Sequence, residues 1–456
     1  MSQQLNQPGY RRDLGDGLVA RWSTARDIEG IAELYATVFR GKLEDPLNER
    51  MMKWARDLGS NRHPSAGAGD FAVVEDTRSN TIVAALVVLQ QGLRYDDVVF
   101  TIGRPEAVAS HPEYRNRGLV RAIFDLLHAR SEQRGDLAQA ITGISYFYRQ
   151  FEYEYAIDLG GERRLPLSTL PELGKDTQEP YQLRPATRAD LPELRVLYER
   201  ECRNPLGATP LVTTPFDEAY WNWVLADQNP ESGQGFNAYM VVDAAGANAG
   251  YVLGGRLRWG QTYPVFGIST HEGVPLFKAV PSILRNLKQI AETTPPWRDE
   301  GKPATSLTLM LGDAHQVYGV LSEEWVTRAE KPYAWYVRVP DVPAFIRHIA
   351  PVLEQRLSHS LAAGYSGECK LDFYRGGLKL AFEQGTLTTV EPWRRPAWGD
   401  RGQAGFPPLV FLQLLFGRRS LDELRHAFPD VWAEEEQAVL LNALFPRQHS
   451  WTLPQD

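Results

Sequence analysis

The sequence has little cysteine and no long apolar run. Its 456 residues include two cysteines, Cys202 and Cys369, which are far apart in the chain. We therefore expect neither a disulfide framework nor a cysteine-based zinc site. Residues 1–17 are polar without an apolar signal core, and the longest apolar runs, 81–89 and 407–416, are too short to span a bilayer. These absences predict a soluble cytoplasmic protein with no membrane partner.

An excess of positive charge is also missing. The chain carries 49 Lys and Arg against 57 Asp and Glu, for a net charge of −8. Nucleic-acid binders usually present a basic face, so we expect no nucleic-acid partner. The acidic balance is compatible with an amine substrate. The histidines at 315, 348, 359, 426 and 449 have no partners at metal-binding spacings, so we expect no metal.

Two common nucleotide-binding motifs are absent. No Gly-x-x-x-x-Gly-Lys-Ser/Thr loop occurs, and no Gly-x-Gly-x-x-Gly stands between a strand and a helix. Instead, an apolar strand runs into Arg115-Asn-Arg-Gly118, and an amphipathic helix starts at Leu119. Free backbone N–H groups and the helix dipole favour an anion at such a turn, and Gly118 lets it approach closely. The turn indicates a pyrophosphate site, and the alternative is an ordinary helix start.

An internal repeat indicates a duplicated domain. Residues 20–35 and 183–198 share a pattern at a constant offset of 163, with the pairs Arg21/Arg184, Thr24/Thr187, Asp27/Asp190 and Leu34-Tyr35/Leu197-Tyr198. Both segments read as a strand, a capping turn and an amphipathic helix. The alternative is chance similarity. At the same offset from Arg115–Gly118 stands Lys278-Ala-Val-Pro281, so the second copy is predicted to keep the fold without the pyrophosphate site.

The hydrophobic patterning divides the chain into three parts, 1–164, 181–333 and 334–456. In the first part it predicts strands at 18–22, 71–75, 82–91, 98–110, 138–144 and 155–159, and helices at 27–39, 46–58 and 119–133. Residues 160–180 read as a linker. In the third part it predicts a helix at 342–361, strands at 370–374, 378–382 and 387–390 with a hairpin at Gly376-Gly377, and helices at 407–416, 421–428 and 434–445. The fold class is α/β and α+β multidomain.

The turn and the order of domains carry a family resemblance. Arg115–Val120 resembles the coenzyme A pyrophosphate loop of the GNAT acetyltransferase superfamily, with Val120 where Gly or Ala is usual. A GNAT-like catalytic domain, a degenerate GNAT-like copy and a sterol-carrier-protein-like third domain together resemble the enhanced-intracellular-survival type of acetyltransferase along nearly the whole chain. The resemblance implies an acetyl-CoA-dependent N-acetyltransferase and a homohexamer. Its acceptor would be a primary amine of lysine, an aminoglycoside or another polyamine-type compound.

The resemblance also assigns site residues. Val108 and Ser110 would contact the pantetheine and thioester of acetyl-CoA through their backbone. Residues Arg115, Asn116, Arg117, Gly118 and Leu119 would hold the pyrophosphate. Tyr148-Arg-Gln-Phe-Glu-Tyr153 resembles the pattern Tyr-x-Arg/Lys-Phe-x-Tyr, whose first tyrosine protonates the coenzyme sulfur. This assigns Tyr148 as the acid, and its alternative role is in an aromatic packing cluster.

The sequence offers several candidates for the general base. In the family the C-terminal carboxylate reaches the first domain, which here would be Asp456. His111, Glu44 and Asp45 are the alternatives. Family members that use aminoglycosides carry an acidic residue after the Phe that ends the first helix, whereas Arg40 and Gly41 follow Phe39 here. The alternative function, from another class, is a non-catalytic scaffold or a lipid or small-molecule carrier that uses the third domain.

Overall fold

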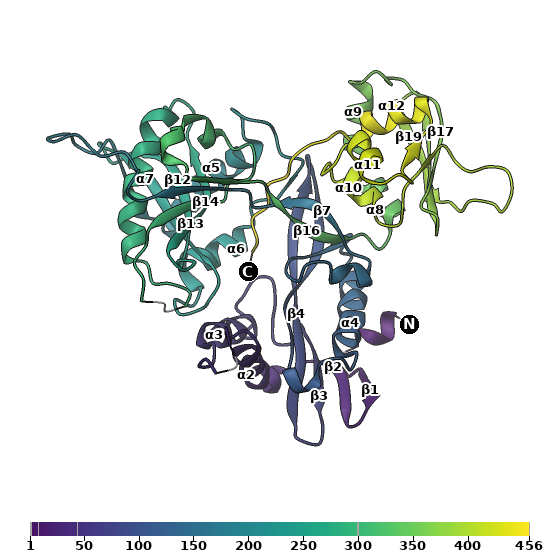
Figure 1. The fold of residues 1–456 in the computed structure, drawn as a ribbon, viewed down its shortest axis with the longest axis horizontal. Helices are drawn as coiled ribbons and strands as arrows, with labels where there is room; N and C mark the ends of the chain where they lie inside the picture. The colour runs from purple at the N-terminus through teal and green to yellow at the C-terminus, as the bar shows by residue number, and fades with distance from the viewer. Residues whose placement is uncertain (1, 8, 43, 299–300, 456) are drawn as a thin grey trace.

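Three β-sheets with their helices make up the molecule. The computed structural model describes all residues except 1, 8, 43, 299–300 and 456. The sheets form three lobes, with the N-terminal lobe joined to both others (Figure 1). Among the described residues, no helix is both long and apolar enough to cross a membrane. Cys202 and Cys369 are buried free thiols.

The first sheet has the order β1-β2-β3-β4-β5-β6-β16-β7, and β10 pairs with the end of β4. Its strands are β1 (Arg11–Gly15), β2 (Leu18–Trp22), β3 (Phe71–Asp76), β4 (Thr81–Tyr95), β5 (Val98–Ser110), β6 (Ala138–Ile141), β7 (Glu154–Leu159), β10 (Val212–Thr213) and β16 (Tyr333–Arg338). Helices α2 (Ile28–Val38) and α3 (Glu49–Leu58) lie on one face, and α4 (Leu119–Gln133) lies on the other (Figure 1).

Strand β4 shows why both faces are covered. Its apolar run alternates between two cores: Ala84, Leu86 and Val88 pack with α4, while Ala85, Val87 and Leu89 pack with α2 and α3. Successive side chains of a strand point to opposite faces, so a continuous apolar run requires a helix layer on each side.

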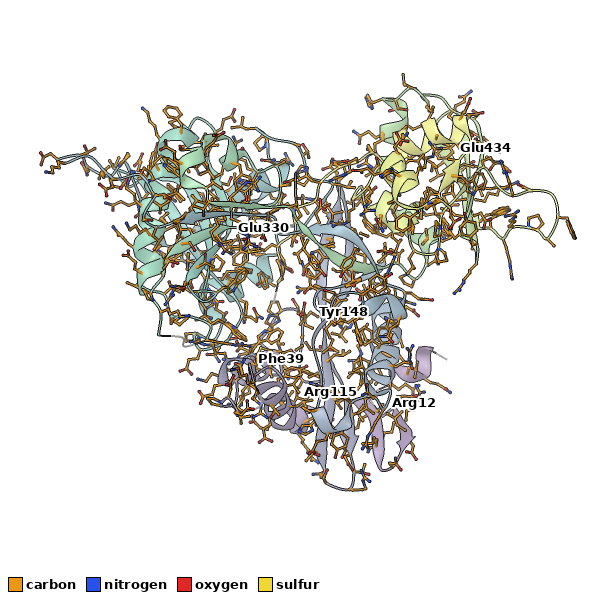
Figure 2. All side chains as sticks on the ribbon, viewed as in Figure 1. Arg12, Phe39, Arg115, Tyr148, Glu330 and Glu434 are labelled. Carbon is orange, nitrogen blue, oxygen red and sulfur yellow. The ribbon has the colours of Figure 1, made fainter. Side chains whose placement is uncertain are left out.

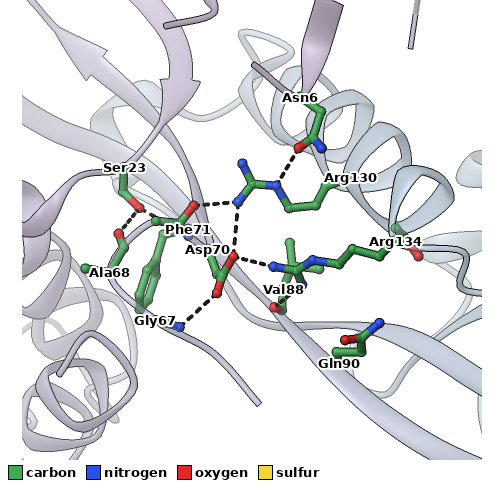
Figure 3. Close-up of polar contacts among 12 residues, drawn as sticks. Asn6, Ser23, Gly67, Ala68, Asp70, Phe71, Val88, Gln90, Arg130 and Arg134 are labelled. Atoms are coloured by element: carbon green, nitrogen blue, oxygen red, sulfur yellow. Dashed lines mark hydrogen bonds and ion pairs between the residues drawn. The ribbon is translucent and has the colours of Figure 1, made fainter. Parts of the chain in front are cut away.

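Helix α4 is tied to the sheet by charge as well as by packing. The carboxylate of Asp70 accepts hydrogen bonds from Arg130 of α4, at 3.1 Å, and from Arg134, the residue directly after that helix (Figure 3). The Arg130 guanidinium also donates to the carbonyl oxygen of Gly69 at 2.6 Å and lies 3.4 Å from the centre of the Trp22 ring. These contacts fix the helix whose N-terminus forms the candidate anion site.

The second sheet has the order β15-β8-β14-β13-β12-β11-β9. Its strands are β8 (Glu162–Pro166), β9 (Tyr181–Pro185), β11 (Phe236–Asp243), β12 (Asn248–Gly255), β13 (Thr262–Thr270), β14 (Ser306–Leu309) and β15 (Arg328–Glu330), with helices α5 (Leu191–Arg203), α6 (Glu218–Asn222) and α7 (Leu276–Thr293). The sequence repeat corresponds to a structural one. Arg21 pairs with Asp27 at 2.7 Å, and Arg184 pairs with Asp190 at 2.6 Å. Both aspartates complete capping boxes.

The first two sheets exchange strands. Residues 160–180 were expected to form a linker, but that expectation is wrong for 162–166, which form β8 between β14 and β15 of the second sheet. In return, residues 334–338, which the sequence division assigns to the third part, belong to β16. That strand lies between β6 and β7 of the first sheet. Pairings between such distant segments leave no local signal in the sequence.

The third sheet has the order β19-β18-β17-β20-β21. Its elements are β17 (Gly367–Asp372), β18 (Gly377–Glu383), β19 (Thr386–Pro392), β20 (Ala404–Gly405), β21 (Trp432–Ala433), α8 (Val342–His348), α9 (Ala350–Ser358), α10 (Phe411–Leu415), α11 (Leu421–Ala427) and α12 (Glu435–Leu444). The hairpin predicted at Gly376-Gly377 is confirmed. The single helix predicted at 342–361 is wrong: it is two helices meeting at Ile349, because Pro351 cannot donate the N–H that would continue the first.

Candidate active site

The first sheet opens between β5 and β6. Within the described chain, the two strands pair only at Ile102↔Ala138 and Gly103↔Gln139, and β5 then continues to Ser110. On its other side, β5 carries a bulge against β4: Val87 pairs with Glu106 and Ala85 with Ala109, and Ala107 has a φ of +50°. Bulges redirect a strand and its side chains. The expected contact residues Val108 and Ser110 therefore lie on the part of β5 that has separated from β6.

The Arg115–Gly118 turn leads directly into α4. Gly118 precedes Leu119 with φ +74°, and a Cβ there would meet nothing within 4 Å. No side chain caps the helix, and its first turn carries no acidic residue. Arg115, Asn116 and Arg117 are exposed, so the space before the helix N-terminus is open and flanked by two guanidinium groups. This arrangement suits a phosphate anion.

Tyr148 lies in an aromatic environment at the start of a short helix, Tyr148–Phe151. It is 3% exposed, and its ring centre lies 5.9 Å from that of Phe124 and 5.5 Å from that of Tyr336. A Cβ built on Gly143 would lie 3.6 Å from its hydroxyl oxygen. Burial and, after it, the negative charge of Glu106 raise the pKa of Tyr148 above its ordinary value. Its phenol therefore stays protonated at neutral pH.

The two neighbouring tyrosines differ from Tyr148. Tyr146 is 71% exposed and its hydroxyl accepts a hydrogen bond from Arg149. Tyr153 is fully buried, and its hydroxyl is 3.1 Å from Nε2 of His128. In Figure 2, Tyr148 lies on the side of the first lobe nearest the other two lobes, with Arg115 below it and Phe39 to the left.

A buried Arg–Glu pair on β5 was not anticipated from the sequence. Nη2 of Arg104 donates to Oε1 of Glu106 at 2.5 Å, and Nη1 donates to Oε1 of Gln91 at 2.7 Å. The Arg104 side chain is 1% exposed. The charge of Glu106 raises the pKa of both Tyr35 and Tyr148, after burial, so its carboxylate is close to both phenols. The available sequence signal was two opposite charges at alternate positions of a largely apolar strand.

The C-terminal tail enters the first domain. The N–H of Leu211 donates to the carbonyl of His449 at 2.8 Å, and the N–H of Trp451 donates to Val212 at 2.9 Å. Nε2 of Gln91, on β4, donates to the carbonyl of Leu453 at 3.0 Å. Gln455 is 2% exposed. Gln91 thus links the tail to Arg104, and the predicted base, Asp456, lies outside the described residues.

The alternative bases are His111, at the end of β5, and Glu44 and Asp45, in the loop after α2. The N–H of His111 donates to the carbonyl of Val83 at 2.8 Å, which continues the strand pairing. Glu44 is exposed. The carboxylate of Asp45 accepts the N–H of Lys42 at 2.8 Å in the loop after α2. Among the described residues, no group of three or more His, Cys, Asp or Glu is arranged to hold a metal ion.

The corresponding opening in the second domain is filled. The N–H of His271 donates to Ala249 at 2.9 Å, as that of His111 does to Val83, which places Ile268 at the position of Val108. The N–H of Ile268 donates to the carboxylate of Glu201 at 2.8 Å. That carboxylate is fully buried, accepts a hydrogen bond from Tyr251 and lies 3.2 Å from His315. In the second domain a protein carboxylate thus accepts the hydrogen bond from the N–H of Ile268. The equivalent N–H in the first domain, that of Val108, would instead bond a ligand.

Comparisons with known proteins agree with this geometry. Residues 20–156 match the family described as Acetyltransferase (GNAT) domain. No curated protein sequence matches the chain. A probable N-acyltransferase from Enterococcus faecalis V583 has a similar structure at 13% identity, with a TM-score of 0.65, over 96% of this chain and 99% of that one.

Two further solved structures are similar over the same extent, 96% of this chain and 99% of theirs. They are a GCN5-related N-acetyltransferase from Kribbella flavida, at 19% identity and TM-score 0.62, and Eis1 from Mycobacterium abscessus, at 13% and 0.57. These likenesses show a shared fold. The family match shows that the first domain is a GNAT acetyltransferase domain and that the protein is an acyltransferase.

Proposed function

We propose that the first domain transfers an acetyl group from acetyl-CoA to a primary amine, by direct attack of the amine on the thioester. The acceptors considered are lysine, an aminoglycoside and other polyamine-type amines. One observation carries the proposal: the open part of β5 has an uncapped, arginine-flanked helix N-terminus at one end and a buried, protonated tyrosine near the other. Acetyl-CoA contains a diphosphate, which the helix N-terminus would bind. It also releases a thiolate, which the tyrosine would protonate.

The binding roles follow from the fit of the turn to a diphosphate. Arg115, Asn116, Arg117, Gly118 and Leu119 hold the pyrophosphate, for which the empty space before Gly118 leaves room. Val108 and Ser110 contact the pantetheine and thioester through their backbone. A strand N–H beside the thioester oxygen would stabilise negative charge as it develops there.

Tyr148 is the acid of the reaction. When the amine attacks, the bond from carbon to sulfur breaks and the leaving thiolate requires a proton. A buried phenol with a raised pKa carries that proton throughout the neutral range. Tyr148 then returns to the neutral form with the proton that the amine released.

The proton acceptor is a carboxylate near the end of the opening. A lysine-type amine has a pKa of about 10.4, so at neutral pH it must lose a proton before or during attack. We propose Asp456, because the described part of the tail, up to Gln455, is buried and anchored to Gln91 of β4. Glu106, whose charge acts on Tyr148, is the second candidate.

Three further properties are proposed from the family resemblance. The third domain, with its antiparallel β17–β19 hairpins and its helices, would be of the sterol-carrier-protein type. The protein would be cytoplasmic and would assemble as a homohexamer, a state that light scattering at several concentrations measures.

The proposed activity is tested by coenzyme A binding and thiol release. Coenzyme A at 100 times its Kd should raise the free energy of unfolding by about 2.7 kcal/mol. A panel of amines with acetyl-CoA should then release free thiol. A carrier or scaffold whose first domain is inactive would show neither effect, and that pair of results would refute the proposal.

A further inference from the structure

A cavity lies between the first two domains. It has a volume of about 820 Å³. One wall comes from Arg40-Gly41, from residues 45–48 and from the first turns of α3. The other wall comes from two segments of the second domain, Pro230-Glu231 and Trp297-Arg298. The cavity is thus built by both domains.

Charged side chains dominate the described lining. It includes four cations, Arg40, Arg50, Lys53 and Arg298, and three carboxylates, Asp45, Glu49 and Glu231. Two of the carboxylates are already engaged, because Lys53 lies 3.0 Å from Glu231 and 3.9 Å from Glu49. The third, Asp45, accepts the backbone N–H of Lys42.

The three arginines have no ion-pair partner within 4.0 Å among the described residues. Arg50 donates to the carbonyl of Pro296 at 3.3 Å. Arg298 donates to the carbonyl of Phe39 at 3.5 Å, and its guanidinium lies 5.0 Å from the centre of the Trp297 ring. The Nε–H group of Arg40 is buried and donates no hydrogen bond within the described chain. With Lys53 paired to Glu49 and Glu231, three guanidinium groups and the carboxylate of Asp45 remain, so the described lining has a positive excess that favours an anion between the arginines.

The cavity is joined to the reacting centre by α2. Arg298 holds the carbonyl of Phe39, the residue that ends this helix. One turn earlier, the ring of Tyr35 lies 5.8 Å from that of Phe39 and close to Glu106. Glu106 and the cavity thus both lie near the C-terminal half of α2, with Tyr35 and Phe39 between them.

We propose that this cavity binds an anionic group, a carboxylate or phosphate, at the end of the acceptor remote from its amine. The planar guanidinium fork matches the oxygen geometry of both groups. The inference rests on the proposed acetyl transfer and narrows its acceptor to amines with a distant acid. Such an acceptor differs from a polycationic one, which these arginines would repel.

Matched acceptors provide the test. 6-Aminohexanoate and 6-aminohexanamide differ only in the charge of the remote group, and 6-aminohexyl phosphate and 6-aminohexanol form the corresponding phosphate pair. The wild type should have a kcat/KM roughly tenfold or more higher for each anion than for its neutral partner. The two pairs distinguish a carboxylate site from a phosphate site.

The variant Arg50→Ala/Arg298→Ala should lose this preference through a roughly tenfold rise in KM for the anion, with kcat unchanged. Arg56→Ala is the control, because it removes the same charge from α3 at an exposed position paired with Glu29. It should keep the preference, and all variants should bind coenzyme A as the wild type does. A wild type without preference, or a preference that survives in the double variant, would overturn the proposal.

A binding experiment separates this proposal from the activity itself. Inorganic phosphate is titrated by calorimetry into protein saturated with coenzyme A, so that the turn at Gly118 is already filled. Heat of binding in the wild type that is lost in the double variant supports the anion site even if no amine is acetylated, in which case only the proposed activity fails. No binding in the wild type, together with no turnover, would reject both.

Discussion

The protonation of Tyr148 is set by its neighbours. The side chain is 3% exposed and lies near the carboxylate of Glu106. Both burial and a nearby negative charge disfavour the phenolate. In the proposed reaction, burial and the charge of Glu106 would thus keep the proton on Tyr148 until the thiolate leaves.

Replacing Tyr148 by Phe removes only the hydroxyl. The ring contacts with Phe124 and Tyr336 remain, so the fold and the affinity for coenzyme A should change little. We expect kcat to fall by roughly 10²–10⁴, as measured by thiol release. Tyr153→Phe, at a buried tyrosine bonded to His128, is the control and should keep most of the activity. Near-normal turnover in the Tyr148 variant would leave water as the acid.

The activity should also have an unusual alkaline profile. The raised pKa of Tyr148 means that the acid form persists where an ordinary tyrosine, with a pKa of about 10, ionises. For an alkylamine acceptor, kcat/KM should rise with pH as the amine deprotonates and should show no decline up to about pH 10. A decline beginning near pH 9, in protein that circular dichroism shows to be folded, would contradict the assignment.

The sequence predicts some of these residues but not others. Tyr148 was predicted because a short pattern carries it. The pattern of residues 98–110 is that of an ordinary strand and does not single out Arg104 or Glu106. Only the fold shows that Arg104 bonds Gln91 and that Glu106 lies near Tyr35. The predicted Asp456 lies outside the described residues, so its role stays a prediction.

At the scale of elements, the junction of turn and α4 depends on one glycine. Gly118 has φ +74° and open space beyond it. Gly118→Leu should abolish coenzyme A binding in calorimetry, because the new side chain would occupy the phosphate position. Gly135→Leu is a close control, since Gly135, just after α4, has φ +79° and equally open space. It should have a similar strain of about 1–2 kcal/mol but normal binding; equal loss in both would point to strain alone.

Local patterns predicted many elements in all three domains. The apolar run of β4, the caps of the repeated helices and the glycines of the β17–β18 hairpin each act within a few residues. Strand β8 was read as linker because its polar residues and short length resemble a loop, and its partners lie far away in sequence. Pairing between strands that are far apart along the chain cannot be read from a single sequence.

At the scale of the whole molecule, the two duplicated domains should differ in binding. Glu201 holds the N–H of Ile268 in the second domain, and no Arg-x-x-Gly turn precedes α7. Titration calorimetry should give one coenzyme A site per chain. The Gly118→Leu variant should give none, whereas residual binding at a second site would show that the second domain is functional.

The tail offers a second test across domains. Trp451 and Leu453 are buried, so a short deletion of Gln455 and Asp456 is preferable to removal of the whole tail. It should reduce kcat/KM by roughly 10² or more while coenzyme A still binds. Glu106→Gln is the companion variant. Normal turnover after the deletion, with loss of activity in Glu106→Gln, would move the base to β5.

The strand exchange also affects how the protein is made. Strand β7 leaves the ribosome about 170 residues before β16, and β6 leaves about 190 residues before it. Strand β16 must lie between the two, and it brings Tyr336 against Tyr148. At ordinary elongation rates the interval between β7 and β16 is roughly 10–35 s. During that time the nascent first domain lacks the strand that lies between β6 and β7 and the packing of Tyr336 on Tyr148. We therefore expect the proposed site to be completed only after the second domain has been synthesised, and a fragment ending at residue 164 to be inactive in the thiol-release assay.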